Sequence, residues 1–249
     1  MTDTDLTKHR VALITGAAHR VGAEISRTFH KHGYDIALHY NNSAKAASIL
    51  AQELNAIRSN SALTFKAQLT NVSDIKAMVK EVLLWRNALD VLINNASSFH
   101  PGTLENSNEK QWDELMGSNL KGPYFLCQAV AAHLRENGSI ISINDIYASS
   151  PLKGYSVYCI AKAGNAMLTK SLAKELAPKI RVNGIAPGVI LWPVTGAQMS
   201  EEIKQKIMDN IPLKRKGDPK DIAETAIFLA TSAGYITGQT IAVDGGSSA

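Results

Sequence analysis

The chain contains only two cysteines, Cys127 and Cys159, and neither belongs to a CxxC pair or a histidine-rich segment. This scarcity argues against a disulfide scaffold or a structural zinc site and is typical of a reducing compartment. No apolar run approaches the roughly 20 residues that a membrane helix requires. The polar start, MTDTDLTKHR, lacks the apolar stretch of a secretory signal. We therefore expect a cytoplasmic protein without a membrane partner.

Metal-ligand patterns and basic stripes are missing too. The formal net charge is only +4, and the basic residues are scattered apart from a short cluster at 214–216. Nucleic-acid-binding proteins usually carry a basic stripe, so we expect no nucleic-acid partner, although a mild positive balance suits an anionic cofactor. We expect no metal site and solvated histidines, since metal-ligand spacing is absent among His19, His30, His32 and His100.

Short β-branched runs alternate with long amphipathic stretches along the 249 residues, without a repeat, low-complexity tract or linker. This alternation is the pattern of repeated βα units around a parallel sheet. We therefore expect a single doubly wound α/β domain over residues 1–249. The expected strands are 11–15, 35–40, 63–67, 90–94, 139–143, 180–185 and 240–243. We also expect one long helix over 110–134, another over 155–176, and irregular structure over 188–211.

A glycine-bearing turn follows the first expected strand, in the segment Thr15-Gly16-Ala17-Ala18-His19-Arg20-Val21-Gly22. Such a turn, leading into a helix N-terminus, directs free backbone N–H groups and the positive helix end at a pyrophosphate. Many tight turns need glycine only for a positive φ, so the glycines alone do not identify a nucleotide site. Their place at the first strand-to-helix junction of an alternating chain favours dinucleotide binding.

The end of the second expected strand distinguishes two cofactors. An NAD enzyme generally places Asp or Glu there, which bonds the ribose 2′-hydroxyl and would repel a 2′-phosphate. This chain has His39-Tyr40-Asn41-Asn42-Ser43, with no carboxylate and several hydrogen-bond donors. The sequence therefore predicts NADPH. The alternative is a polar turn that makes no cofactor contact.

Tyr158 and Lys162 lie four positions apart in an expected helix, so their side chains share one face. An ammonium close to a phenol favours the phenolate, and we expect Lys162 to lower the pKa of Tyr158 so that it exchanges a proton near neutral pH. Accidental Tyr and Lys pairs are common in helices. The surroundings strengthen this one: the glycine turn, Asn94-Asn95-Ala96, Asn119, and Pro187-Gly188.

With these motifs in order, the chain resembles the short-chain dehydrogenase/reductase family over essentially its whole length. The matching segments are TGAAHRVG, NNAS, Asn119, YCIAK from Tyr158 to Lys162, RVNGIAPG and ITGQTIAVDGG. The resemblance implies a seven-stranded Rossmann-like sheet in a homotetramer. It also implies that Tyr158 is the acid, that Lys162 holds the nicotinamide ribose, and that Asn119 supports a water relay.

The resemblance further implies where the cofactor makes its contacts. Gln68 stands where relatives often use Asp to contact adenine, and an amide can still make that bond. The expected cofactor-binding residues are Gly16, Arg20, Val21, Tyr40, Asn41, Asn42, Ser43, Gln68, Leu69, Asn95, Ala96, Ser97, Lys162, Pro187, Gly188 and Val189.

Three departures from the family pattern resemble its pteridine reductase branch. Asp145 stands thirteen residues before Tyr158, where the family normally has Ser; Arg20 replaces a glycine of the turn; and the usual NNAG reads NNAS, continuing Ser98-Phe99. The resemblance to this branch implies that a pterin ring stacks between Phe99 and the nicotinamide, with polar contacts from Ser97 and Arg20. Asp145 and Tyr158 would then supply protons to a ring nitrogen while hydride reaches carbon.

The exchange of Ser for Asp145 also has a physical argument of its own. A carbonyl oxygen that gains negative charge needs a neutral hydroxyl donor beside it. An ionised carboxylate in that place would oppose the developing charge. A ring nitrogen that is being protonated tolerates a carboxylate that can accept and pass protons. Asp145 would otherwise cap a turn at a strand end, and Phe99 would otherwise be a packing residue.

Three functional hypotheses remain at this stage. The first is an NADPH-dependent reductase of dihydropteridine or dihydrofolate substrates, for which the expected catalytic residues are Asp145, Tyr158, Lys162 and Asn119, and the expected substrate-binding residues are Arg20, Ser97, Phe99, Asp145 and Tyr158. The second is a carbonyl reductase acting on 3-oxoacyl thioesters. The third is a catalytically silent NADPH-binding regulator.

Overall fold

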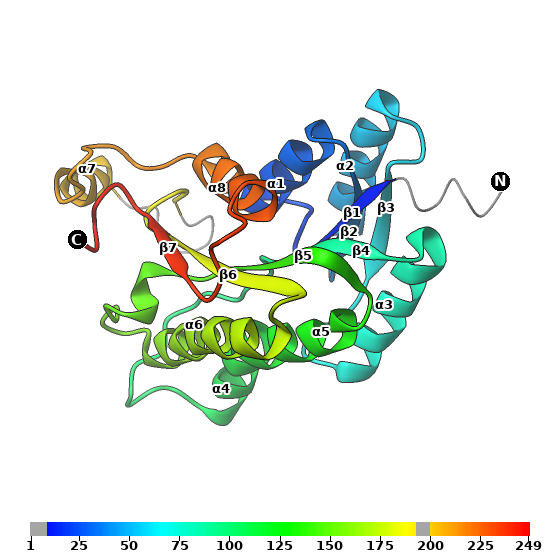
Figure 1. Ribbon diagram of the computed structural model, residues 1–249. Helices are drawn as coiled ribbons and strands as arrows, with labels where there is room; N and C mark the ends of the chain where they lie inside the picture. The colour runs from blue at the N-terminus through cyan, green and yellow to red at the C-terminus, as the bar shows by residue number, and fades with distance from the viewer. Residues whose placement is uncertain (1–8, 193–199) are drawn as a thin grey trace.

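A parallel sheet of seven strands runs through the molecule in the order β3-β2-β1-β4-β5-β6-β7, with helices on both faces (Figure 1). The computed structural model describes residues 9–192 and 200–249. The strands are β1 (Arg10–Ile14), β2 (Tyr34–Tyr40), β3 (Ala62–Lys66), β4 (Leu89–Asn94), β5 (Leu134–Ile143), β6 (Ile180–Pro187) and β7 (Thr240–Val243). The expected Rossmann-like α/β fold is confirmed.

The central strands are apolar on both faces because helices cover both. In β4, Val91 and Ile93 pack toward one layer of helices while Leu92 packs toward the other, as the two-residue repeat of a strand requires. One layer consists of α1 (Arg20–Lys31), α2 (Ala44–Ile57) and α8 (Pro219–Thr231); the other contains α3 (Val72–Arg86), α5 (Gly122–Ala131) and α6 (Ser156–Leu176) (Figure 1).

The long helix expected over 110–134 was wrong. The segment forms α4 (Glu109–Met116), a π turn (Gly117–Lys121) and α5, and β5 begins at Leu134. Pro123 has no N–H to bond the carbonyl of Asn119, four residues earlier, so a regular α-helix cannot run through this point. The ladder shifts to π spacing, in which Gly122 N–H donates to the carbonyl of Gly117.

Two smaller expectations were also wrong. The segment expected to be irregular contains α7 (Glu201–Asp209), which the Ser200 hydroxyl caps by accepting from Ile203 N–H at 3.3 Å. His30 is buried rather than solvated, and its Nε2 lies 2.7 Å from the Ser61 hydroxyl. Among residues 9–192 and 200–249, no group of three or more histidine, cysteine or acidic side chains could hold a metal ion.

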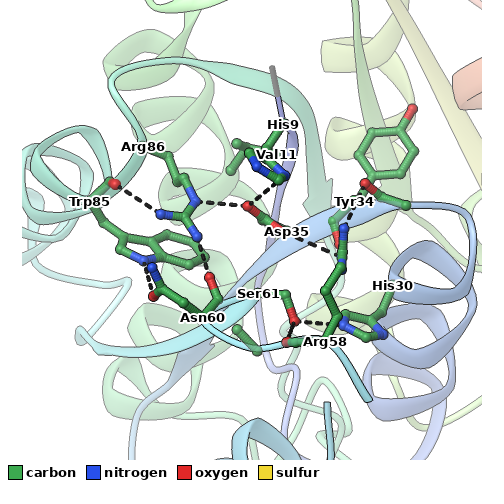
Figure 2. Close-up of polar contacts among 12 residues, drawn as sticks. His9, Val11, His30, Tyr34, Asp35, Arg58, Asn60, Ser61, Trp85 and Arg86 are labelled. Carbon is green, nitrogen blue, oxygen red and sulfur yellow. Dashed lines mark hydrogen bonds and ion pairs between the residues drawn. The ribbon is translucent and has the colours of Figure 1, made fainter. Parts of the chain in front are cut away.

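A buried ion-pair cluster lies at the amino ends of the strands, where β2 begins (Figure 2). The Asp35 carboxylate is 2% exposed and pairs with Arg86 at 2.8 Å, Arg58 at 3.3 Å and His9 at 3.7 Å. We call these four residues the Asp35 cluster. It joins β2 to the end of α3 and to the segment after α2, on the edge of the sheet opposite the carboxyl ends of the strands.

The carboxyl ends of β1 and β4 meet at the point where the strand order reverses direction. Open parallel sheets bind their ligands in the crevice outside this point. The described helices include none that is long and apolar enough to span a membrane.

Candidate functional site

The glycine turn lies between β1 and α1, at the carboxyl edge of the sheet. Gly16 has a φ of +61°, and a Cβ there would lie 3.0 Å from Ala96 Cα. At Gly22 a Cβ would lie 2.2 Å from the Gly16 carbonyl oxygen, so only glycine lets α1 pack this closely on the turn. The first turn of α1 has no acidic residue, and the N-cap His19 makes no side-chain capping bond to any described residue. The amino end of α1 is therefore suited to an anion.

Thr15 and Asn95 hold this turn in place. The Thr15 hydroxyl accepts from Asn95 N–H at 2.9 Å and Ala96 N–H at 3.0 Å. The Asn95 amide donates to the carbonyls of Thr15 at 2.8 Å and Gly16 at 3.2 Å. Asn95 and Ala96, which we expected at the cofactor, thus lie beside the turn, where their polar groups build its shape.

His39 is a second support for the turn and was absent from the expected site residues. Its Nδ1 accepts from Gly16 N–H at 3.1 Å, its Nε2 lies 3.1 Å from the Ala67 carbonyl, and its own carbonyl accepts from Ala17 N–H. Burial lowers the pKa of His39 to about 4, so the ring is neutral at pH 7. A neutral ring that accepts at Nδ1 must donate from Nε2, which fixes its tautomer.

The polar segment after β2 lies beside the same edge. Tyr40 and Ser43 are half-buried, and Asn41 and Asn42 are exposed. Ser43 is the N-cap of α2, yet its hydroxyl makes no capping bond to any described residue, and the first turn of this helix has no acidic side chain. The free N–H groups here lie where the sequence predicts the 2′-phosphate of NADPH.

The remaining expected cofactor residues fall into two places. Gln68 and Leu69 follow β3; the Gln68 amide donates to the Thr70 hydroxyl at 3.0 Å, and the Leu69 side chain is buried in the core. Pro187, Gly188 and Val189 lie at the end of β6, where a Cβ on Gly188 would come within 2.6 Å of Asp244 Cβ.

Arg20 links the glycine turn to the segment after β6. It has a φ of +52°, uncommon for a residue with a side chain. Its guanidinium donates to the carbonyls of Leu191 at 3.3 Å and Trp192 at 3.2 Å. The next segment, 193–199, lies outside the described residues. Val21, also expected at the cofactor, is the second residue of α1 and packs against the core.

Asp145 and Tyr158 form a direct pair at the end of β5 and the start of α6. The Tyr158 hydroxyl donates to Asp145 Oδ2 at 2.6 Å, and Asp145 Oδ1 accepts from Tyr147 N–H at 2.9 Å. The turn-capping role and the contact with the phenol, which the sequence left as alternatives, therefore coexist on the two oxygens of one carboxylate.

The pKa values of this pair show where protons are held. Burial, together with the charge of Asp145 and the hydrogen bond to it, raises the pKa of Tyr158 above its ordinary value, which contradicts the expected lowering by Lys162. Burial also raises the pKa of Asp145, although the bonds from Tyr158 and Tyr147 N–H and the charge of Lys162 oppose the shift. Tyr158 is therefore a neutral phenol at pH 7, a proton donor rather than a phenolate.

Lys162 does not contact the phenol oxygen of Tyr158. Its Nζ donates to the Ile143 carbonyl at 2.9 Å and lies 5.7 Å from the centroid of the Tyr158 ring. Burial lowers the pKa of Lys162 to about 8, partly offset by the charge of Asp145. Its ammonium is thus held at the end of β5, one helical turn from Tyr158.

Asn119 lies in the π turn and is fully buried. Its amide donates to the carbonyls of Ser98 at 3.0 Å and Leu115 at 2.9 Å. Its Oδ1 has no partner among the described residues. The expected role in a water relay therefore remains a proposal, although an unpaired buried acceptor is a position where an internal water commonly binds.

Phe99 and Ser97 belong to the loop that leaves β4. Phe99 stacks on Tyr155, with ring centroids 4.7 Å apart, and meets the edge of Tyr158 at 4.8 Å. It remains 45% exposed, and Ser97 is exposed as well. The structure thus places the expected substrate-binding ring directly beside the Asp145–Tyr158 pair, with part of its surface exposed.

Comparisons with known proteins show which proteins the chain is similar to. A family model described as enoyl-(acyl carrier protein) reductase matches residues 16–248. The 3-oxoacyl-[acyl-carrier-protein] reductase FabG of Staphylococcus aureus is 37% identical over 239 residues, covering 94% of this chain and 96% of the relative. Pteridine reductase 1 of Leishmania tarentolae is also 37% identical, over 280 residues and 96% of each chain.

One solved structure extends the likeness to three dimensions. A blue fluorescent protein from a metagenomic library, in complex with NADPH, superposes with a TM-score of 0.90 at 29% identity, covering 96% of this chain and 98% of the other. Sequence and fold agree over nearly the entire length. The chain is therefore a short-chain oxidoreductase and belongs to the short-chain dehydrogenase/reductase family.

Proposed function

We propose that this protein is an NADPH-dependent reductase of pteridines, converting a dihydropteridine or dihydrofolate to its tetrahydro form. The hydrogen bond of 2.6 Å from the Tyr158 hydroxyl to Asp145 Oδ2 carries the proposal. The proposed acid, Tyr158, shares its proton with the carboxyl group of Asp145. At the position of Asp145, a ketone reductase needs a neutral hydroxyl that donates to the carbonyl oxygen of its substrate. The reduction adds a hydride to the carbon of a C=N bond and a proton to its nitrogen.

NADPH is the cofactor of this reductase, and it supplies the hydride when bound. The glycine turn and the amino end of α1 would hold its pyrophosphate, and Lys162 its nicotinamide ribose. The segment 40–43 and the uncapped start of α2 would hold the 2′-phosphate. No carboxylate lies in that segment to repel the phosphate.

The chain's own residues then bind the pteridine and deliver the proton. Phe99 keeps 45% of its surface exposed and would stack on the pteridine there, and Ser97 lies two residues before it for polar contact. Tyr158 keeps its proton because burial and the charge of Asp145 raise its pKa, so the phenol can donate that proton to a ring nitrogen as the nitrogen gains charge. Burial also raises the pKa of Asp145, which favours return of a proton to the pair. The Arg20 guanidinium would give up its hydrogen bonds to the carbonyls of Leu191 and Trp192 and donate instead to the substrate or to the pyrophosphate.

Reduction of 3-oxoacyl thioesters is the second candidate. The Staphylococcus aureus relative favours it, and the family model is also named for an acyl-carrier-protein substrate. Sequence identity does not discriminate, because the pteridine reductase relative is equally similar at 37%. The catalytic pair on the same scaffold would then protonate a carbonyl oxygen. A silent NADPH-binding regulator, the third hypothesis, would have no use for the paired acid.

Replacing Asp145 by Ser distinguishes the candidates. NADPH oxidation by the wild type should proceed with dihydrobiopterin, dihydromonapterin or dihydrofolate and fail with an acetoacetyl thioester. Asp145→Ser should lower kcat/KM for the pteridine by at least about 10²-fold, because the proton-sharing carboxyl is lost. Asp145→Asn keeps an acceptor for Tyr147 N–H and should lose activity equally. Turnover of the thioester alone would overturn the proposal, and turnover of nothing would favour the silent binder.

The segment after β2 sets the cofactor preference. We expect NADPH to bind at least about tenfold more tightly than NADH, and Asn42→Asp to weaken NADPH binding by a similar factor, because a carboxylate there repels the 2′-phosphate. Fluorescence titration of the reduced cofactors measures both. Asn137→Asp, which adds the same charge near the start of β5, is the matched control. Tighter binding of NADH by the wild type would contradict the assignment.

We further propose that the protein is a homotetramer. Large apolar side chains remain exposed on the helical layer that carries the site, where Trp112, Tyr124 and Met167 are 44%, 45% and 59% exposed. Such side chains are suited to burial between subunits. Light scattering should give the mass of four chains, and the mass of one chain would contradict the tetramer.

A further inference from the structure

In the π turn between α4 and α5, the backbone carbonyl of Asn119 has no α-helical hydrogen-bond partner. An α-helical ladder would pair the carbonyl of Asn119 with the N–H of residue 123, which is proline and has none. The Asn165 side chain takes that place, since its Nδ2 donates to the Asn119 carbonyl at 2.7 Å. A residue of α6 therefore completes the hydrogen bonding of a turn more than forty residues earlier in the chain.

Asn165 lies on the catalytic face of α6. It follows Lys162 by three residues, and residues at this spacing are neighbours on a helix surface. Its side chain is 3% exposed, in a tight contact between α6 and the π turn. At the preceding residue, Gly164, a Cβ would lie only 2.7 Å from Leu120 Cδ2. The orientation of the π turn is thus set by α6 at this point.

The contact continues from the π turn into the substrate loop. The Asn119 amide, whose direction the turn determines, donates to the Ser98 carbonyl at 3.0 Å. Ser98 lies between Ser97 and Phe99, the two residues proposed to contact the pteridine. A continuous series of hydrogen bonds therefore runs from Asn165 through Asn119 to Ser98, and all of these groups are buried or partly buried.

We propose that Asn165 is a positioning residue: by holding the carbonyl of Asn119 it fixes the π turn and, through Ser98, the loop that presents Ser97 and Phe99 to the substrate. The inference rests on the proposed function, because it assumes that this loop binds the substrate. Asn165 touches neither the substrate nor the reacting atoms. Its effect is on geometry, and small displacements in an active site have large kinetic consequences.

Asn165→Leu tests the proposal, since leucine is similar in size to asparagine but has no hydrogen-bond donor. Amide hydrogen exchange should become about tenfold faster in residues 95–102 and 117–122, because a buried acceptor loses its partner and the two segments loosen together. For whichever organic substrate the wild type reduces, kcat/KM should fall on the order of 10- to 100-fold. The NADPH dissociation constant should stay unchanged.

Thr169→Val is the matched control, because Thr169 lies one turn further along α6, is equally buried, and bonds only the main-chain carbonyl of Asn165. It should change neither exchange in those segments nor kinetics. If Asn165→Leu does not fold, the smaller Asn165→Ala, which also lacks a donor, gives the same test. Unchanged exchange in 95–102 and 117–122, or exchange that rises equally in the control, would overturn the proposal. Failure of the wild type on every pteridine would refute the proposed function and leave the exchange result intact.

Discussion

Tyr158→Phe should lower turnover by about 10²- to 10⁴-fold, the range that loss of a general acid usually costs. The phenol is the group that donates to Asp145, and burial together with Asp145 keeps it protonated at pH 7. Phenylalanine retains the ring against which Phe99 packs, so the position of Phe99 beside the substrate should be unchanged. We expect kcat to fall, while the dissociation constant for NADPH, measured by fluorescence titration, stays close to that of the wild type.

Tyr34→Phe is a suitable control for this substitution. Tyr34 is as buried as Tyr158, 3% against 4% exposed, but lies at the start of β2, on the opposite edge of the sheet. Loss of its hydroxyl should leave kcat unaffected. Retention of wild-type turnover by Tyr158→Phe would remove the phenol from the proton-transfer step, and a parallel loss of NADPH binding would indicate damage to the site instead.

Asp35→Asn should reduce the free energy of unfolding by about 3–5 kcal/mol, because removing one partner of a buried ion pair leaves uncompensated charge behind. Asp35 is 2% exposed, and the side chain of Arg86, 2.8 Å away, is 7% exposed. Asparagine keeps the shape but loses the charge that balances Arg86 and Arg58 (Figure 2). Urea unfolding at one fixed protein concentration measures the change.

Glu53→Gln provides the contrast for this stability prediction. Glu53 pairs with Arg27 at 2.7 Å by the same chemistry, but the two side chains are 41% and 44% exposed. An exposed pair contributes only about 0–1 kcal/mol, so this variant should unfold almost as the wild type does. Equal losses in the two variants would show that burial of the Asp35 cluster is not the source of its stabilisation.

The sequence was sufficient for the architecture because hydrophobic alternation and glycine placement are local signals. It missed the interruption of the helix after Met116, although Gly117, Gly122 and Pro123 mark it, because an amphipathic pattern continues across the segment. It also missed α7, whose N-cap signal at Ser200 stands in an otherwise polar segment. Both errors arose where hydrophobic periodicity was given more weight than capping and breaking residues.

The sequence names a set of expected catalytic residues, whose roles stay predictions, but it could not predict their electrostatics. Spacing places Lys162 one turn after Tyr158, but only the fold shows that its ammonium bonds the Ile143 carbonyl and that a carboxylate faces the phenol. His39 and Asn165 had no local signal for the same reason. Each acts on a backbone group distant in sequence, Gly16 and Asn119 respectively, and such a partner exists only after folding.

The Asp35 cluster has a consequence for how such a protein can diversify. Its ion pairs lie at the amino edge of the sheet, far from the loops at the carboxyl edge that surround the Asp145–Tyr158 pair. Mutations in those loops can then accumulate without breaking these ion pairs, and the substrate specificity can change while the fold is retained. Such a division between the two edges of the sheet would favour relatives that differ in substrate at equal distance from this chain. The two reductases with different named substrates, each 37% identical to it, are an example.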